Sequence, residues 1–151
     1  LGLEIVPVSD LSAALRASDM VVTCTPARQW YVGRADIRAG TFIAAIGADH
    51  HDKQEIEPAL LAASTVVVDS LEQCATIGDL HHALCAGAMT REAVHASLGQ
   101  IAAGTRPGRR HSDETIVFDS TGTALQDVAA AAIAYEAAVA GGHGLTVDLS
   151  H

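Results

Sequence analysis

Five consecutive ionisable residues follow one apolar segment, and their types could support proton transfer or metal binding. The segment "TFIAAIG", residues 41–47, precedes Ala48 and then Asp49, His50, His51, Asp52 and Lys53. A carboxylate beside an amine can accept its proton and stabilise the resulting cation. Histidine and aspartate also bind metals, but adjacent residues in an extended turn point apart. The sequence therefore favours a solvated loop at His50 and His51 and predicts no metal site.

Small, hydroxylated and acidic residues follow three other apolar segments. They are Thr23-Cys24-Thr25-Pro26, Asp69-Ser70 and Asp119-Ser120-Thr121-Gly122. Helix capping explains Asp69 and Ser70, because Ser70 and Gln73 have the spacing of a capping box. For residues 119–122, capping and ligand binding both remain open, since Gly122 permits a turn as well as close backbone approach.

Alternating strands and helices must position these residues. Buried strands are predicted at 20–25, 41–47, 65–69 and 115–119, where β-branched and small apolar residues run without interruption. Helices are predicted to start at Ser9 or Asp10, at Pro58, after Ser70 and near Thr123, the last one ending near Ala140. Further predictions are a strand within "LEIVPV" (3–8), a helix over 90–104 and a possible strand in "HGLTVDL" (143–149).

This alternation predicts an α/β fold with a parallel sheet flanked by helices, in a single domain over residues 1–151. In such sheets, ligands bind at the carboxyl ends of the strands. The four segment ends described above should therefore meet at one edge and form a polar cleft for a small ligand.

Composition narrows the possible partners. The formal net charge of −9 argues against nucleic acid or an anionic membrane surface as the main partner. No apolar run is long enough to span a bilayer. Three cysteines at irregular spacing indicate reduced thiols in a cytoplasmic protein, with Cys24 and Cys74 buried.

Five segments in this order resemble the C-terminal part of the ornithine cyclodeaminase/mu-crystallin family. They are "DMVVTCTPA", "GTFIAAIGADHHDKQEIEPALLAAS", "VVVDSLEQC", "GDLHHAL" and "ETIVFDSTGTALQDVAAA". The resemblance implies a Rossmann-type domain that binds NAD or NADP. It also implies an enzyme acting on an amino acid or a cyclic imine, by deaminating cyclisation or by imine reduction through hydride transfer.

The resemblance assigns roles to individual residues. Asp49 matches the family's aspartate that faces the reacting amino group. Thr23 and Thr25 match a T-x-T motif along the cofactor, although a cap or turn role remains an alternative for them. Gly47 would serve the nicotinamide side, and Ser120, Thr121 and Gly122 would line the same side of the cleft.

Other family features are not found in this sequence. It contains no G-x-G-x-x-G motif for a cofactor pyrophosphate. We therefore expect the chain to start after the second Rossmann strand, to lack the first two strands, and to bind the cofactor weakly or not at all. The edge of segment 20–25 would then be open, and "EIVPV" (4–8) or a second copy of the chain would pair with it.

The last predicted helix carries an apolar stripe, formed by Leu125, Val128, Ala132, Tyr135 and Val139. By resemblance, residues from about 121 to 151 would return to an N-terminal domain. Without that cover, the stripe predicts a homo-oligomer. Two hypotheses follow: an inactive cofactor-domain fragment of an NAD(P)-dependent enzyme, or a non-catalytic binding or assembly protein. The upstream reading frame would distinguish them.

Overall fold

A computed structural model describes residues 2–148 of the chain. These residues divide into two compact units, one ending at Thr121 and the other beginning at Gly122. The first unit contains the sheet and its covering helices, and the second contains one long helix. Each unit is described by itself.

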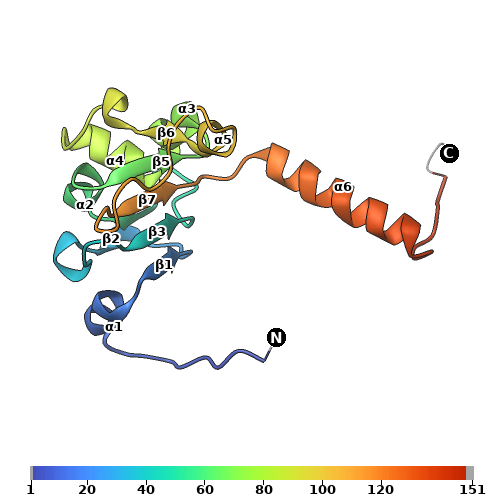
Figure 1. The fold of residues 1–151 in the computed structure, drawn as a ribbon, viewed down its shortest axis with the longest axis horizontal. Helices are drawn as coiled ribbons and strands as arrows, with labels where there is room; N and C mark the ends of the chain where they lie inside the picture. Colours follow the sequence, from blue (N-terminus) through green and yellow to red (C-terminus); the bar gives the residue numbers. More distant parts are fainter. Residues whose placement is uncertain (1, 149–151) are drawn as a thin grey trace. The chain divides into compact units, whose positions relative to one another are not determined.

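The first unit is built on a five-stranded parallel sheet, which confirms the predicted fold class. Figure 1 shows the strands side by side in the spatial order β1-β3-β7-β5-β6. Their bounds are β1 Met20–Thr23, β3 Phe42–Ala45, β7 Ile116–Asp119, β5 Thr65–Val68 and β6 Ala96–Ser97. The last strand in the chain thus lies in the middle of the sheet. Sequence order alone did not indicate this.

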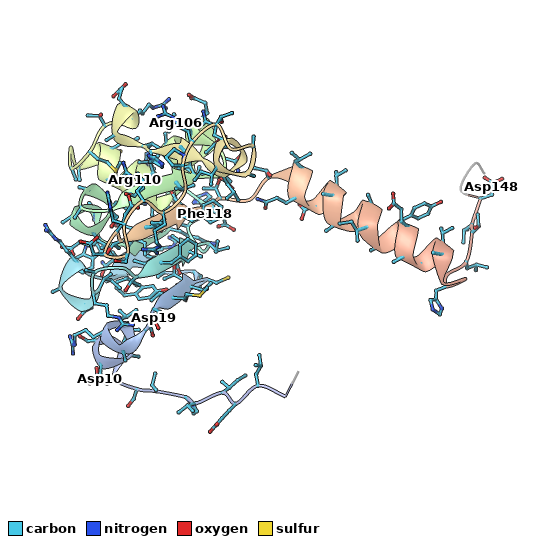
Figure 2. The ribbon with its side chains drawn as sticks, in the orientation of Figure 1. Asp10, Asp19, Arg106, Arg110, Phe118 and Asp148 are labelled. Atoms are coloured by element: carbon cyan, nitrogen blue, oxygen red, sulfur yellow. The ribbon has the colours of Figure 1, made fainter. Side chains whose placement is uncertain are left out.

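Short helices connect the strands. They are α1 Leu11–Ala17, η1 Arg34–Asp36, α2 Pro58–Ala62, α3 Leu71–Ile77, α4 Asp79–Cys85, η2 Arg91–Ala93 and α5 Leu98–Ala102. Asp10 caps α1 by accepting a hydrogen bond from the Ala13 N–H at 2.9 Å, and Figure 2 labels it at the start of that helix. Pro58 occupies the start of α2, and Ser70 caps α3, as predicted.

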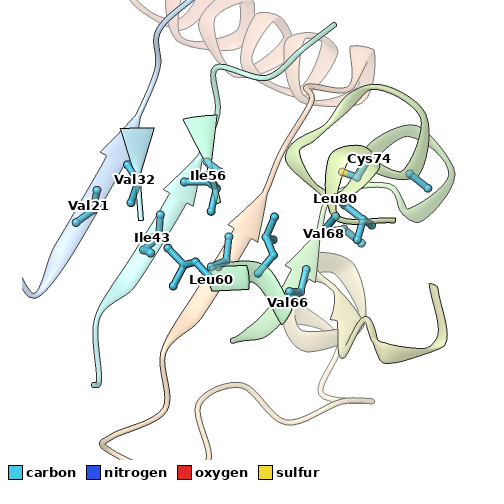
Figure 3. Close-up of a cluster of buried hydrophobic side chains, with 14 of the residues drawn as sticks. Val21, Val32, Ile43, Ile56, Leu60, Val66, Val68, Cys74 and Leu80 are labelled. Carbon is cyan, nitrogen blue, oxygen red and sulfur yellow. The ribbon is translucent and has the colours of Figure 1, made fainter. Parts of the chain in front are cut away.

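The hydrophobic core lies on one face of the sheet. Alternate residues of the strands point to this face, including Val21, Ile43, Val66 and Val68 in Figure 3. Helices α2, α3 and α4 cover them with fully or nearly fully buried side chains, among them Leu60, Leu61, Cys74 and Leu80. This packing fixes α2, which follows β4, and α3 and α4, which follow β5, against the sheet.

The opposite face of the sheet is only partly covered. Met20 and Val22 point to this face and are 70% and 67% exposed. The prediction of a buried strand over 20–25 is therefore wrong for Met20 and Val22, whereas Val21 and Thr23 on the other face are buried. Farther along the same face, Phe42, Val67, Ile116 and Phe118 line an apolar cavity of ≈ 330 Å³ with residues of α5 and its flanking loops.

A second, two-stranded parallel sheet was not predicted. It consists of β2 Arg28–Val32 and β4 Gln54–Ile56. These strands have few consecutive apolar residues, so neither produces a strand pattern in the sequence. Val32 and Ile56 nevertheless are fully buried in the core, which anchors the small sheet to the large one.

Several other predictions are corrected. Residues 3–8 form no strand, and β1 has no neighbour on its outer edge within the described residues. Pro7 has no N–H for a sheet ladder, and Ile5 is 86% exposed. The region 90–104 is not one helix but η2, β6 and α5, because the Ser97–Gln100 capping box starts α5 there.

Two smaller corrections concern the C-terminus and the thiols. Residues 143–148 form no strand, and Leu149 lies outside the described residues. Cys74 is buried as predicted, but Cys24 is exposed because it follows β1 on the face away from Thr23.

The second unit contains the predicted long helix, α6 Ala124–Ala140. No residue of α6 is buried, and Leu125, Val128, Tyr135 and Val139 are each more than half exposed. The residues of the predicted apolar stripe thus lie on one side of α6, and their side chains are exposed. Across residues 2–148, no helix combines the length and apolar character needed to cross a membrane.

Candidate functional site

The ends of the parallel strands lie side by side in register. Thr23 pairs with Ala45, Ala45 with Asp119, and Asp119 with Val68. The ladder continues one residue further, since the Ile46 N–H donates to the Thr23 carbonyl and the Ser120 N–H donates to the Ala45 carbonyl, both at 2.9 Å. The segments after β1, β3 and β7 therefore leave the sheet at one edge, as the sequence predicts.

A buried glutamate joins the segments that follow β1 and β3. Glu55 Oε1 accepts hydrogen bonds from the Thr25 N–H and hydroxyl, each at 2.7 Å, and from the Tyr31 hydroxyl at 2.9 Å. Its Oε2 accepts from the Gly47 N–H at 2.9 Å. One carboxylate thus holds two predicted cofactor-binding residues, Thr25 and Gly47, at a fixed separation.

The surroundings of Glu55 keep it ionised. Burial acts to raise its pKa, but the hydroxyls of Thr23, Thr25 and Tyr31 and the N–H of Thr25 outweigh burial and leave the pKa below its ordinary value. Tyr31 responds in the opposite sense, since burial and the glutamate charge raise its pKa to about 12. The Glu55 carboxylate, which lies beneath Thr25 and Gly47 and forms the floor of the site, is therefore negatively charged.

Two buried hydroxyls at the strand ends make no hydrogen bond to any described residue. Within the described residues, Thr23 Oγ1 and Thr121 Oγ1 are buried and make no hydrogen bond. The Thr23 hydroxyl is near enough to Glu55 to favour its charge without reaching hydrogen-bond geometry. Buried hydroxyls normally find a partner, so these two are available to a polar ligand group or a water molecule.

Two buried aspartates connect Glu55 to the end of β7. Asp79 Oδ1 accepts from the N–H groups of Glu55 and Ile56 at 2.8 and 2.9 Å. Asp119 in turn accepts from the N–H groups of Asp79 at 3.3 Å and Leu80 at 2.9 Å. The N–H of each acid thus donates to the carboxyl of the next, and this series reaches the strand end that carries Ser120.

Burial dominates the protonation of these aspartates. It raises the pKa of Asp79 to about 6, against the two N–H donors that favour its charge. Burial, with the charge of Asp79 next to it, raises the pKa of Asp119 to about 8. At neutral pH, Asp119 is therefore mainly protonated while Glu55 is ionised.

Asp49, the predicted catalytic residue, is exposed at the rim of this edge. Its side chain is 56% exposed, and Oδ1 accepts a hydrogen bond from Lys53 Nζ at 2.5 Å. This hydrogen bond lowers the pKa of Asp49, so its carboxylate is ionised at neutral pH. Lys53 pairs with Asp49 and not with Glu55, because Glu55 points into the protein.

The residues after β7 are held differently. The Ser120 hydroxyl donates to Asp69 Oδ2 at 2.9 Å, which ties the end of β7 to the end of β5. Thr121 is the last residue of the first unit, and Gly122 begins the second with φ +81°, a conformation that favours glycine. Thr23, Ser120 and Thr121 are all buried.

The histidine pair next to Asp49 is exposed. His50, His51 and Asp52 have potential ligand atoms within 4.8 Å of one another. Asp52 is already engaged by His51 Nε2 at 3.1 Å and by Arg28 at 3.8 Å. These contacts match the solvated loop that the sequence favoured.

Sequence reasoning missed Glu55, Tyr31 and Asp79. Glu55 stands between polar residues in "DKQEIE", where it resembles an ordinary surface charge. Only the placement of β4 beneath the strand ends buries it. The sequence offers only the presence of glycine at position 47; the structure shows its reason, since a Cβ there would lie 2.5 Å from Glu55 Oε2.

Comparison with known proteins identifies the family. A profile of the ornithine cyclodeaminase/mu-crystallin family matches residues 1–142. The chain belongs to this family. The resemblance carried by the five sequence segments is thereby confirmed.

Family members of known activity share both sequence and fold with this chain. An alanine dehydrogenase of Archaeoglobus fulgidus is 43% identical over 121 residues, which are 80% of this chain and 38% of that enzyme. The solved dimer of an archaeal alanine dehydrogenase with bound NAD has a TM-score of 0.88 at 39% identity, over 95% of this chain and 44% of that one.

A third relative is a reductase. The Delta(1)-pyrroline-2-carboxylate reductase of Thermococcus litoralis, solved with NADH and L-proline, has a TM-score of 0.88 at 33% identity. The alignment covers 93% of the chain described here and 44% of the reductase. The chain therefore spans less than half the length of these relatives.

Proposed function

We propose that this chain forms the nicotinamide-side part of an NAD(P)-binding domain, in an enzyme that transfers hydride to or from the α-carbon of an amino acid or cyclic imine. The observation that carries the proposal is the common sheet edge where the ends of β1, β3 and β7 meet in register. Relatives solved with NAD or NADH share this fold at TM-scores of 0.88. The cofactor, when bound, accepts or supplies the hydride.

The residues at the edge fit such a group. The unpartnered hydroxyls of Thr23 and Thr121 can bind a polar group of the cofactor or its associated water. Gly47 brings the backbone close to Glu55 and leaves no side chain at the end of β3. Thr25 and Ser120 complete the proposed cofactor-binding residues of the first unit.

We assign the acid–base role to Asp49. Its carboxylate is ionised and lies at the rim, where an amine can reach it. In the oxidative direction Asp49 accepts a proton from the substrate amine as the hydride leaves the α-carbon, and the product is an imine. In the reductive direction it stabilises the iminium cation and returns the proton. Lys53 holds the carboxylate in place.

A titration with half-cofactors tests the proposal. Nicotinamide mononucleotide, followed by two-dimensional NMR of the labelled chain, is expected to shift the amide signals of Thr23, Thr25, Gly47 and Ser120. Binding at about millimolar affinity or weaker is expected, since the sequence contains no G-x-G-x-x-G motif to hold a pyrophosphate. Adenosine monophosphate at the same concentrations should leave these signals in place. Shifts with neither nucleotide, or equal shifts with both, would reject the proposal.

The proposed role of Asp49 is tested by measuring catalytic turnover. In protein expressed from the complete reading frame, Asp49→Asn is expected to lower kcat by about 10²–10⁴-fold, the usual contribution of a general acid–base group. His51→Gln, two residues away and exposed, is the matched control and should retain activity. An unchanged kcat in the Asp49→Asn protein would show that Asp49 is not the acid–base group.

The alternative is a non-catalytic binding or assembly role. The uncovered apolar stripe of α6 favours it, because a long helix with exposed Leu125, Tyr135 and Val139 suits association with another chain. Assembly without any nucleotide response in the titration above would support this alternative over the enzyme.

A further inference from the structure

Glu55 contacts the proposed site without pointing into it. All four groups that donate to its carboxylate belong to the segment after β1, to β2 or to the segment after β3. Two of these donors are the N–H groups of Thr25 and Gly47, residues that the proposed function places beside the cofactor. The side chain thus acts on the site through its two loops.

The cost of burying this charge suggests a specific role. Glu55 is 0% exposed, and among residues 2–148 no lysine or arginine forms an ion pair with it. Removing a carboxylate from water is costly, and an apolar side chain would fill the same space more cheaply. An ionised group is suited here because only a carboxylate accepts four hydrogen bonds from two directions at once.

Gly47 and Glu55 are matched in shape as well as in hydrogen bonding. A Cβ at position 47 would lie 2.5–2.6 Å from all three terminal atoms of the glutamate side chain. Glycine therefore allows the N–H to approach the carboxylate, and the contact sets how close the segment after β3 lies to Thr25.

The backbone of Glu55 is itself fixed from the other side. Asp79 accepts its N–H at 2.8 Å, and Asp119, at the end of β7, accepts the N–H of Asp79. The carboxylate of Glu55 is therefore held relative to the third strand end as well as to the first two.

We infer that Glu55 is a positioning residue, which holds Thr25 and Gly47 at the separation that the nicotinamide side of the cofactor requires. The inference rests on the proposed function for its ligand, and on the four hydrogen bonds of the carboxylate for its geometry.

The substitution Glu55→Gln should break the hydrogen bond to one loop and keep the hydrogen bonds to the other. The amide oxygen replaces Oε1, which accepts three hydrogen bonds, and the NH₂ group then faces the Gly47 N–H. Two donors cannot pair, so Gly47 is released while Thr25 keeps its contact. Hydrogen exchange should therefore accelerate at the Gly47 amide far more than at Thr25, and the dissociation constant for nicotinamide mononucleotide should rise about tenfold.

Glu114→Gln is the matched control. Glu114 accepts hydrogen bonds from Thr65 and Arg110 at the opposite edge of the sheet, and its side chain is only 9% exposed. This variant loses the same charge and should lose stability, but it should keep both Gly47 protection and nucleotide affinity.

A measurement on the unsubstituted chain covers the case in which Glu55→Gln does not fold. A scalar coupling across the hydrogen bond from the Gly47 N–H to the Glu55 carboxyl carbon is expected, together with slow exchange of that amide. Absence of the coupling with fast exchange at Gly47 would overturn the inference. So would a Glu114→Gln protein that loses as much affinity as Glu55→Gln.

Failure of the inference differs from failure of the proposed function. If the unsubstituted chain does not respond to the mononucleotide, the proposed function fails, and the positioning role for a cofactor fails with it. If that chain binds and Glu55→Gln binds equally well, only the role of Glu55 fails.

Discussion

The carboxyl group of Asp119 lies directly against the backbone of Gly78. A Cβ on Gly78 would lie 2.5 Å from Asp119 Oδ2, and the same oxygen accepts the Leu80 N–H at 2.9 Å. Gly78 has an extended backbone that any residue adopts, so the requirement for glycine at this position is steric. The start of α4 thus packs onto the end of β7 through a contact that admits no side chain.

Gly78→Ala is expected to destabilise the fold by about 1–3 kcal/mol, because the added methyl group displaces a buried carboxyl held by two N–H donors. Urea unfolding measures the change. Gly99→Ala, within α5 and with only Ser97 Oγ nearby at 3.9 Å, is the control and should gain up to about 1 kcal/mol from its helix propensity. Equal midpoints for the two variants would contradict the packing argument.

Stability should fall as the pH rises from mildly acidic to mildly alkaline. The pKa of Asp119 is raised from 3.8 to about 8 by burial, so the folded state binds a proton that the unfolded state releases. The stabilisation is complete below the unfolded pKa and is lost as the pH rises through about 8. Asp79, with its pKa raised to about 6, acts in the same direction over a narrower range.

The expected loss between pH 5 and 8.5 is on the order of 2–4 kcal/mol in the free energy of unfolding. Asp119→Asn, which resembles the protonated acid, should flatten this dependence. Asp127→Asn changes an exposed carboxyl of α6 and should leave the slope as it is. A slope unaffected by Asp119→Asn would show that another group takes up the proton.

Lys53→Gln should raise the pKa of Asp49 toward its ordinary value, because the hydrogen bond from the ammonium group is the main cause of the lowered pKa. Carboxyl carbon NMR of Asp49 during a pH titration measures it. The free energy of unfolding should change by less than about 1 kcal/mol, since both side chains are partly exposed. Arg28→Gln, next to Asp52, should leave the Asp49 titration unchanged; an identical response in both variants would count against the pairing.

The exposed stripe of α6 predicts self-association. Replacing Tyr135 and Val139 by Glu is expected to give a smaller particle in sedimentation experiments, because charge would then replace the apolar surface. The control places the same two charges on the other side of the helix, with Ala130→Glu and Ala137→Glu. If both double variants sediment like the unsubstituted chain, the stripe is not an interface.

Local patterns were sufficient for the main strands and helices. Runs such as "TVVV" and caps such as Asp10 act over a few residues, so β5 and α1 could be predicted from the sequence. The short strands β2, β4 and β6 could not, because they are defined by the strand each one pairs with. The segment 3–8 shows the converse, since an apolar run without a partner forms no strand.

By itself, the sequence determined the parallel α/β class, the common edge for the strand ends, and the family. The fold class and the common edge follow from the spacing of the apolar residues, and the family follows from the order of the sequence motifs. Only the tertiary structure decided that Glu55 lies beneath Thr25 and Gly47, and that Asp79 and Asp119 continue the network to β7. The physical reason is that the charge, burial and hydrogen bonding of an acid depend on residues distant in sequence, and a carboxylate in a polar stretch looks the same whether it is solvated or buried.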